Sequence, residues 1–200
     1  MLSLSDQKKL RTLRYYGCNI LIHLFSGDLS YLIDILRVIY EANDGKKYPV
    51  NINVQDQVIH NYSRKMIALL KYVKTDVIPS LYDVCYYFGM LAKHKLFSMN
   101  QEFLSLEVEI EGGSTLQDRA ISELLTYGVF IDGGLNNTSS GKLSRKLIFR
   151  KIYTPAFPIS FRNRNSFLLD SKAFDDFIHN PKDYTNSLIS REGDIPDLIA

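Results

Sequence analysis

The sequence predicts a mainly α-helical protein with a small β-hairpin in its second half. Apolar residues recur at three- and four-residue spacing through much of residues 10–70, which is the period of helices that bury one face. Strict alternation of apolar and polar residues occurs at 104–111 and indicates a half-buried strand. The stretch 133–141, GGLNNTSSG, separates two short apolar runs in the manner of a hairpin loop.

Residues 1–75 are expected to form a small helical segment. Apolar positions at helical spacing continue from residue 10 to Phe25. A second amphipathic helix is expected at 28–42, with Asp28 as its N-cap, and a third at 54–72. These helices precede a proline-containing break near residue 79.

The elements after this break follow the order helix, strand, helix, strand, loop, strand. Ser80 is the expected N-cap of the first, and Asp83 completes a capping box. The predicted elements are a helix at 81–97, a strand at 104–111, a helix at 115–127, a strand at 129–132, a polar loop at 133–141 and a strand at 143–153. This is the order of a winged helix, in which a helix-turn-helix core precedes a hairpin whose loop is the wing. We expect this domain at 80–169, followed in residues 170–200 by a short helix and, from Pro181, a loosely held tail.

Charge is strongly segregated along the chain. Residues 100–132 hold one basic and seven acidic residues, whereas residues 133–169 hold seven basic residues and no carboxylate. The candidate nucleic-acid-binding residues are Lys142, Arg145, Lys146, Arg150, Lys151, Arg162 and Arg164. Such a stretch either tracks a phosphate backbone or is a solvated surface beside neutralising neighbours. The helix before the hairpin carries Asp118 and Glu123, which disfavours docking of that helix in a major groove.

The sequence contains none of the common catalytic motifs. Gly141-Lys142 is followed by leucine and lacks the glycine that a Walker A loop requires five residues earlier, and GxSxG, HExxH and GxGxxG are absent. We therefore expect no catalytic residues and no cofactor held by this chain. Glu107, Glu109 and Glu111 share one face of the alternating strand, where a cation could bind, but we interpret them as the wet face of an edge strand and expect no metal site.

The sequence also indicates a cytoplasmic protein. The N-terminal residues have no apolar run behind their charges, unlike a signal peptide. The longest apolar stretch, residues 20–25, is far too short to span a bilayer, so no membrane partner is expected. Cys18 and Cys85 are the two cysteines and form no CxxC pair, which is typical of reduced thiols.

Three strings resemble a known family, the AAA+ ATPases of the origin-recognition-complex type, including their bacterial relatives. LFSGDLSYLIDIL at 24–36 resembles the sensor-2 lid helix. YGVFID at 127–132 and LIFRKIYTPAF at 147–157 resemble the winged hairpin of the bacterial relatives. The resemblance covers most of the chain. It implies a helical AAA+ lid-like segment followed by a winged-helix domain, with the Walker motifs, ATP and Mg²⁺ of the parent ATPase upstream of residue 1.

The resemblance also implies a sensor-2-like turn at Gly27, Asp28 and Ser30. The family usually places an arginine two residues after the aspartate, where it touches a nucleotide phosphate, and this sequence has Ser30 there. The function expected from these features is a non-catalytic module that binds double-stranded DNA and takes part in assembly. The alternative is a protein-interaction module that docks a partner subunit or a second copy of itself.

Overall fold

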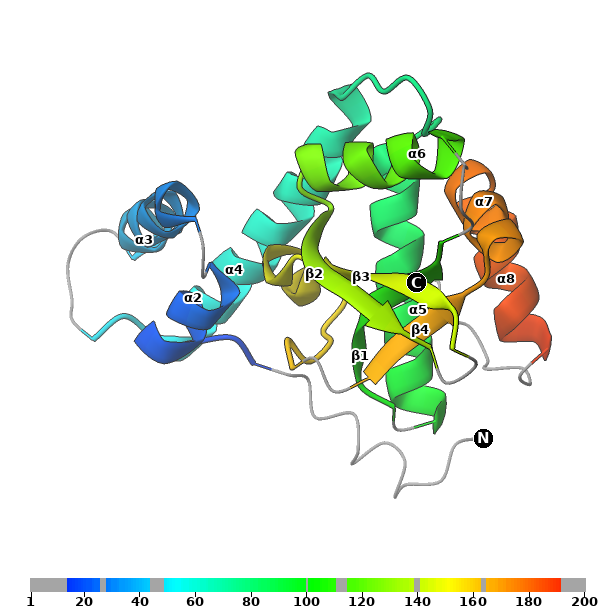
Figure 1. The fold of residues 1–200 in the computed structure, drawn as a ribbon. Helices are drawn as coiled ribbons and strands as arrows, with labels where there is room; N and C mark the ends of the chain where they lie inside the picture. The colour runs from blue at the N-terminus through cyan, green and yellow to red at the C-terminus, as the bar shows by residue number, and fades with distance from the viewer. Residues whose placement is uncertain are drawn as a thin grey trace.

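We describe the protein from a computed structural model, in which the later helices pack around a small sheet and the N-terminal helices lie to one side of it (Figure 1). The described residues are 14–25, 28–43, 49–99, 101–110, 115–138, 141–162 and 165–191. The elements are α2 (Cys18–Leu24), α3 (Leu29–Ala42), α4 (Ile52–Leu69), the 3-10 helix η1 (Leu70–Tyr72), α5 (Leu81–Met99), β1 (Phe103–Glu109), α6 (Thr115–Thr126), β2 (Phe130–Asn137), β3 (Leu143–Phe149), the 3-10 helix η2 (Lys151–Ala156), β4 (Asn165–Leu169), α7 (Ser171–His179) and α8 (Pro181–Arg191). The prediction of a mainly helical protein with a small β component is confirmed.

Local capping signals set the starts of α3 and α5. The Asp28 carboxylate accepts hydrogen bonds from the backbone N–H groups of Ser30 and Tyr31 at the start of α3. Ser80 Oγ accepts one from the N–H of Asp83, 3.1 Å away, at the start of α5. These bonds satisfy N–H groups that have no partner inside their own helix. The two predicted N-caps, Asp28 and Ser80, are therefore confirmed.

The sheet has four strands in the order β2-β3-β1-β4. β1 pairs antiparallel with β3 and parallel with β4, so it lies at the centre of the sheet. The interpretation of Glu107 and Glu109 as the wet face of an edge strand is therefore wrong, and Glu111 lies outside the described residues. Alternation reports that a strand has two unequal faces but not how many neighbours it has. β4 was not predicted, because its parallel partner is about sixty residues earlier in the chain.

Aromatic side chains fill the space between α5 and the sheet. Phe88 on α5 is fully buried. Its ring centroid lies 5.7 Å from that of Phe103, 5.1 Å from that of Phe130 and 4.8 Å from that of Phe149. Tilted and edge-to-face pairs at these separations are the favoured aromatic geometry. This cluster anchors the first, second and third strands to one helix.

The hairpin and the C-terminal segment differ from their predicted boundaries. β2 continues to Asn137, so most of the expected polar loop is strand, and β3 ends at Phe149, which places Lys151 in η2. The residues from Pro181 form helix α8, which packs against α5, instead of a loose tail. Proline is favoured at the first helical position because its φ is already helical, so Pro181 starts a helix here. Residues 192–200 lie outside the described residues.

Candidate nucleic-acid interface

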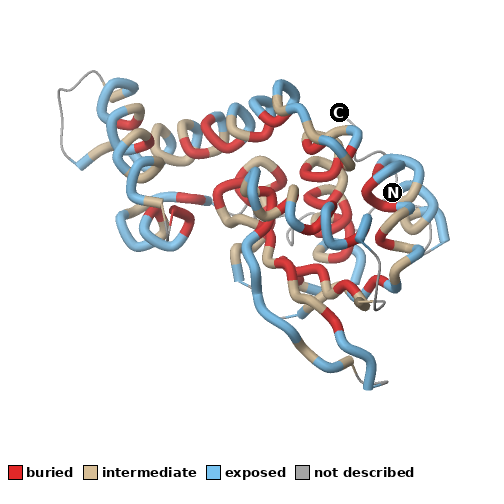
Figure 2. The backbone as a smooth tube through the Cα atoms, turned by 45° about the horizontal axis from the view of Figure 1, so that its top comes forward, coloured by how far each residue is buried: buried red, intermediate tan, exposed pale blue. Residues whose placement is uncertain are grey.

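The β2–β3 hairpin is the most exposed strand pair of the described sheet. β2 is an edge strand whose residues 131–135 are all exposed, and Figure 2 shows this strand in pale blue beside the buried positions of β3. Thr138 closes the described part of the tip, since its N–H donates to the carbonyl of Lys142 and its carbonyl accepts from the N–H of Gly141. Ser139 and Ser140 lie outside the described residues. The hairpin therefore offers a polar, accessible edge.

Two of the predicted nucleic-acid-binding residues form ion pairs on this hairpin. Lys142 Nζ lies 2.7 Å from Glu109 Oε2. Arg145 donates from Nη2 to Asp132 Oδ2 over 2.6 Å and from Nε to Asp132 Oδ1 over 3.3 Å. The guanidinium lowers the pKa of the Asp132 carboxyl, and that carboxylate raises the pKa of Arg145. Carboxylates outside the basic stretch thus balance part of its charge.

Lys146 lies at the centre of β3 and, unlike Lys142 and Arg145, has no carboxylate partner among the described residues. It lies opposite Glu107 in the β1–β3 register, but Glu107 Oε1 accepts a hydrogen bond from Asn136 Nδ2 at 2.8 Å. Lys146 forms no recorded ion pair with a described residue. Its stem runs over Gly133, where an added Cβ would lie 2.9 Å from Lys146 Cγ. Lys146 is therefore an available cation on the outward face of the hairpin.

Arg150 lies at the base of the hairpin and bridges to the N-terminal helices. Its Nη2 lies 3.4 Å from Asp28 Oδ2, and its guanidinium carbon lies 5.7 Å from the ring centroid of Tyr31. An added Cβ on Gly128 would lie 2.6 Å from Arg150 Nη1, so this glycine leaves room for the guanidinium. The Arg150 side chain is 24% exposed. Arg150 therefore links the start of α3 to the end of β3 through its contact with Asp28.

The remaining predicted contacts are spread beyond the hairpin. Lys151 is half-buried in η2, and Arg162 is exposed in the segment before β4. Arg164 lies outside the described residues. The structure therefore places Arg145 and Lys146 on β3 and Lys142 directly before that strand, and it does not gather all the predicted residues into one patch.

In the sensor-2-like turn, the Asp28 carboxylate accepts hydrogen bonds from neighbouring residues of the same turn. Gly27 lies outside the described residues. Asp28 accepts from the hydroxyl of Ser30 at 2.6 Å as well as from the two N–H groups that it caps. The Ser30 hydroxyl is the largest cause that lowers the Asp28 pKa, so the turn carries a negative charge. Arg150 is already paired with that carboxylate, so the described residues of this turn do not fit a nucleotide phosphate.

One family model matches most of the chain. That model, described as ORC-CDC6-like, matches residues 1–169. The chain belongs to the ORC-CDC6-like family. No curated protein and no solved structure matches the chain significantly. None of the described helices is long and apolar enough to cross a membrane, and no group of three metal-ligating side chains occurs among the described residues.

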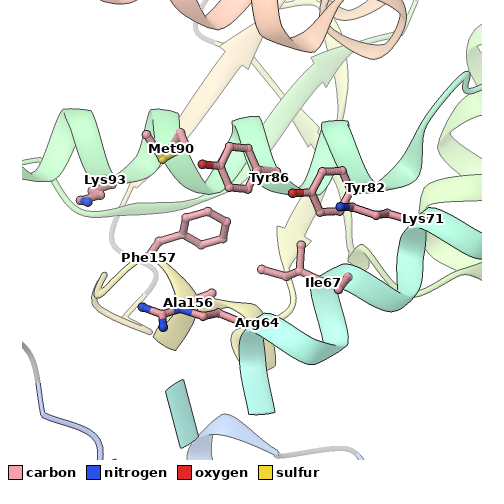
Figure 3. Close-up of a pocket in the computed structure, with 10 residues that line it drawn as sticks. Arg64, Ile67, Lys71, Tyr82, Tyr86, Met90, Lys93, Ala156 and Phe157 are labelled. Atoms are coloured by element: carbon pink, nitrogen blue, oxygen red, sulfur yellow. The ribbon is translucent and has the colours of Figure 1, made fainter. Parts of the chain in front are cut away.

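One feature of this ORC-CDC6-like chain was not predicted from its sequence. A groove of about 340 Å³ lies between α4 and α5 and is lined by aromatic and basic side chains (Figure 3). Its residues come from α4, η1, α5, η2 and the residue after η2, so segments far apart in the sequence meet here. Tyr82 and Tyr86 stand four residues apart on α5, and Arg64 and Lys71 seven apart along α4 and η1. These helical spacings are the signal that could have pointed to a shared face.

Proposed function

We propose that this ORC-CDC6-like protein is a non-catalytic module that binds double-stranded DNA through the β2–β3 hairpin and takes part in assembly of an AAA+ ATPase. The observation that carries the proposal is the order α5, β1, α6, β2, β3 together with the strand order β2-β3-β1. This is the arrangement expected of a winged helix with the hairpin as its wing. The added parallel strand β4 extends the sheet on the side away from the hairpin.

The hairpin, rather than helix α6, is the element suited to DNA. Glu123 on α6 accepts hydrogen bonds from the N–H groups of Asp76, Val77 and Ile78 over 2.9 to 3.0 Å. This carboxylate holds the loop before α5, so the face of α6 around it is acidic and already engaged. A negatively charged face is unfavourable beside phosphates, whereas a polar hairpin that carries lysines can lie along them.

The ion pair of Lys142 does not prevent it from binding phosphate. The Lys142 side chain is 64% exposed, and exposed ion pairs typically contribute about 0.2–1 kcal/mol. Binding of Lys142 to a DNA phosphate releases counterions from the DNA, and this release favours the phosphate over Glu109 as the partner of Lys142. Lys146 needs no such exchange, since it has no recorded ion pair with a described residue. These two lysines are the phosphate contacts that we propose.

Binding of a fluorescent duplex across a salt series tests this proposal. The Lys142→Gln/Lys146→Gln variant should bind any duplex more weakly, and its log–log salt slope should fall by about 0.9 per lost contact. Arg145 is left unchanged, because it also holds β2 through Asp132. The matched control is Lys172→Gln/Lys182→Gln, which removes two exposed charges from α7 and α8 and should bind like the unmodified protein. Absence of salt-dependent binding near ~50 mM salt, or equal loss in both variants, would contradict the proposal.

The chain on its own is expected neither to bind nor to hydrolyse ATP. The sequence has no Walker A loop, and the Asp28 turn presents a carboxylate where a nucleotide phosphate needs a cation. Titration calorimetry with ATP and Mg²⁺, and a phosphate-release assay, measure these two properties. Micromolar affinity, or turnover that persists through purification and scales with the protein peak, would contradict this part of the proposal.

A second function, docking of a partner subunit, is favoured by the exposed apolar face of α3. Ile35 and Ile39 are buried on one side of this helix. The adjacent side carries a further stripe at helical spacing, namely Leu29, Ile33, Leu36 and Tyr40, all of them exposed. A helix that is apolar on two sides is typically covered on both. If docking is the main function, duplex binding will be weak and insensitive to Lys142 and Lys146, whereas Ile33→Glu will abolish association.

A further inference from the structure

The groove between α4 and α5 combines positive charge with aromatic surface. Arg64 from α4, Lys71 from η1 and Lys93 from α5 lie around it, and no carboxylate lines it. Within the part of the chain that the structure describes, none of the three forms a recorded ion pair. Burial lowers the pKa of the Lys93 ammonium, which is consistent with a cation that has no protein counter-charge. The groove therefore suits an anionic ligand.

The wall on the α5 side is aromatic. The rings of Tyr82 and Tyr86 are nearly parallel, with centroids 5.8 Å apart and planes 15° apart. The ring of Phe157 packs against Tyr86 from η2's C-terminal end, with centroids 5.8 Å apart. Figure 3 shows both tyrosines on the same side of the groove, facing Ile67 and Phe157. This wall is a stacking surface for a planar group.

Lys71 connects the charged and aromatic parts of the groove. Its Nζ lies 4.3 Å from the centroid of the Tyr82 ring. The Tyr82 ring is half-buried and lines the open groove, so the cation over it is in contact with solvent and an aromatic ligand can replace it on that ring. The released ammonium then remains close enough to pair with a negative group attached to that ligand. A base linked to a phosphate has this combination of planar ring and anion.

We propose that this groove binds single-stranded nucleic acid, with a base stacked on Tyr82 and the backbone phosphates paired with Arg64, Lys71 and Lys93. Aromatic stacking surfaces beside cationic grooves are the general mode of single-strand binding, and stacking tolerates any base. A volume of about 340 Å³ fits one nucleotide unit and not a duplex. The site is separate from the β2–β3 hairpin and does not depend on the duplex-binding proposal.

An acidic polypeptide is the main competing ligand. It would pair with the same three cations, but its carboxylate side chains have no planar ring that could stack on the tyrosines. The near-parallel tyrosines and the cation that covers one of them therefore favour a base over a carboxylate side chain. This difference decides the choice of probe, because a stacked base quenches an adjacent indole and a glutamate does not.

The first test uses a reporter in the groove. The chain contains no tryptophan, so a Tyr82→Trp variant has one indole, placed at the proposed stacking position. Titration with oligothymidylate of about 12 nucleotides should quench its fluorescence with a saturable curve. The Lys142→Gln/Lys146→Gln changes should leave this curve unaltered, which separates the groove from the hairpin. No quenching, or equal quenching by polyglutamate of the same length, would overturn the proposal.

The second test needs no change to the aromatic wall and so is independent of how well that variant folds. Arg64→Gln should weaken binding of labelled oligothymidylate several-fold in anisotropy and lower the salt slope by about 0.7, the value for one single-strand phosphate contact. Lys65→Gln is the matched control, since it removes the same charge from the next residue of α4, outside the groove. Tyr82→Leu should weaken binding by about tenfold. Equal effects of Arg64→Gln and Lys65→Gln would overturn the proposal.

Discussion

Helices α3 and α5 use their apolar residues in different ways. α5 lies against the sheet and α8, and one side of it, which includes Leu81, Phe88 and Leu91, is buried inside the chain. α3 buries Ile35 and Ile39 but leaves Leu29 at 70% and Ile33 at 60% exposure. The helix at 28–42 was predicted from its apolar stripe, and the helix at 81–97 from the start signals at Ser80 and Asp83. The difference shows that periodicity identifies a helix but not whether its partner lies in the same chain.

Removal of the central aromatic of α5 should have the largest effect. Phe88→Ala would leave a cavity among Phe103, Phe130 and Phe149 and is expected to lower the free energy of unfolding by about 3–5 kcal/mol. Urea denaturation followed by circular dichroism measures the change. A loss below about 1 kcal/mol would show that this cluster is not the core of the protein.

Addition of a methyl group to α5 should have the next largest effect. A Cβ at Gly89 would overlap the ring of Phe157, so Gly89→Ala should destabilise the protein by about 1–3 kcal/mol. Phe157→Leu makes room and should recover part of this loss in a double-mutant cycle measured by the same urea denaturation. Additive effects of the two changes would mean that the helix and η2 can separate without cost.

The cap of α3 should have a smaller effect that depends on pH. Asp28→Ala should lower the free energy of unfolding by about 1 kcal/mol, and Asp28→Asn by less, because asparagine also caps helices. The folded-state pKa of Asp28 is lowered, so its carboxylate stabilises the fold fully above the unfolded pKa of about 3.9. That contribution is lost as the pH falls through the folded value. The difference between wild type and Asp28→Asn, measured by thermal unfolding, should therefore shrink only in acid, and a difference that grows in acid would contradict the bridge to Arg150.

The exposed stripe of α3 should have the smallest effect on stability. Ile33→Ser is expected to change the free energy of unfolding by less than about 0.5 kcal/mol, because its side chain is already in water. Sedimentation velocity of the two proteins at matched concentration then tests whether the stripe mediates association. A large loss of stability with no effect on association would show that α3 is covered by its own chain.

Features that depend on neighbouring residues were predictable from the sequence, whereas contacts between distant segments were not. Asp28 and Ser80 were identified as caps because an N-cap acts on N–H groups two or three residues away. The parallel pairing of β4, and the bridge of Arg150 to Asp28 across 122 residues, depend on the folded arrangement and leave no trace in local composition.

The basic stretch shows the same limit for the site. Its lack of carboxylates was evident from the sequence, but its partners Glu109 and Asp132 come from the preceding acidic stretch. Strand pairing brings the two stretches together, so a charge count along the chain overstates the charge of the surface. The sequence thus predicted that one strand carries Arg145 and Lys146, but not that Arg145 has an ion pair with a described residue and Lys146 has none.

Hydrogen exchange measured with and without duplex DNA tests the proposed role of the hairpin most directly. β2 is an edge strand, so its outward N–H groups are open to solvent and report whatever covers them. Duplex DNA at saturating concentration should slow exchange at residues 130–149 and leave α3 unchanged. Slowed exchange at α3 with none at the hairpin, or no change at either, would contradict DNA binding through this hairpin.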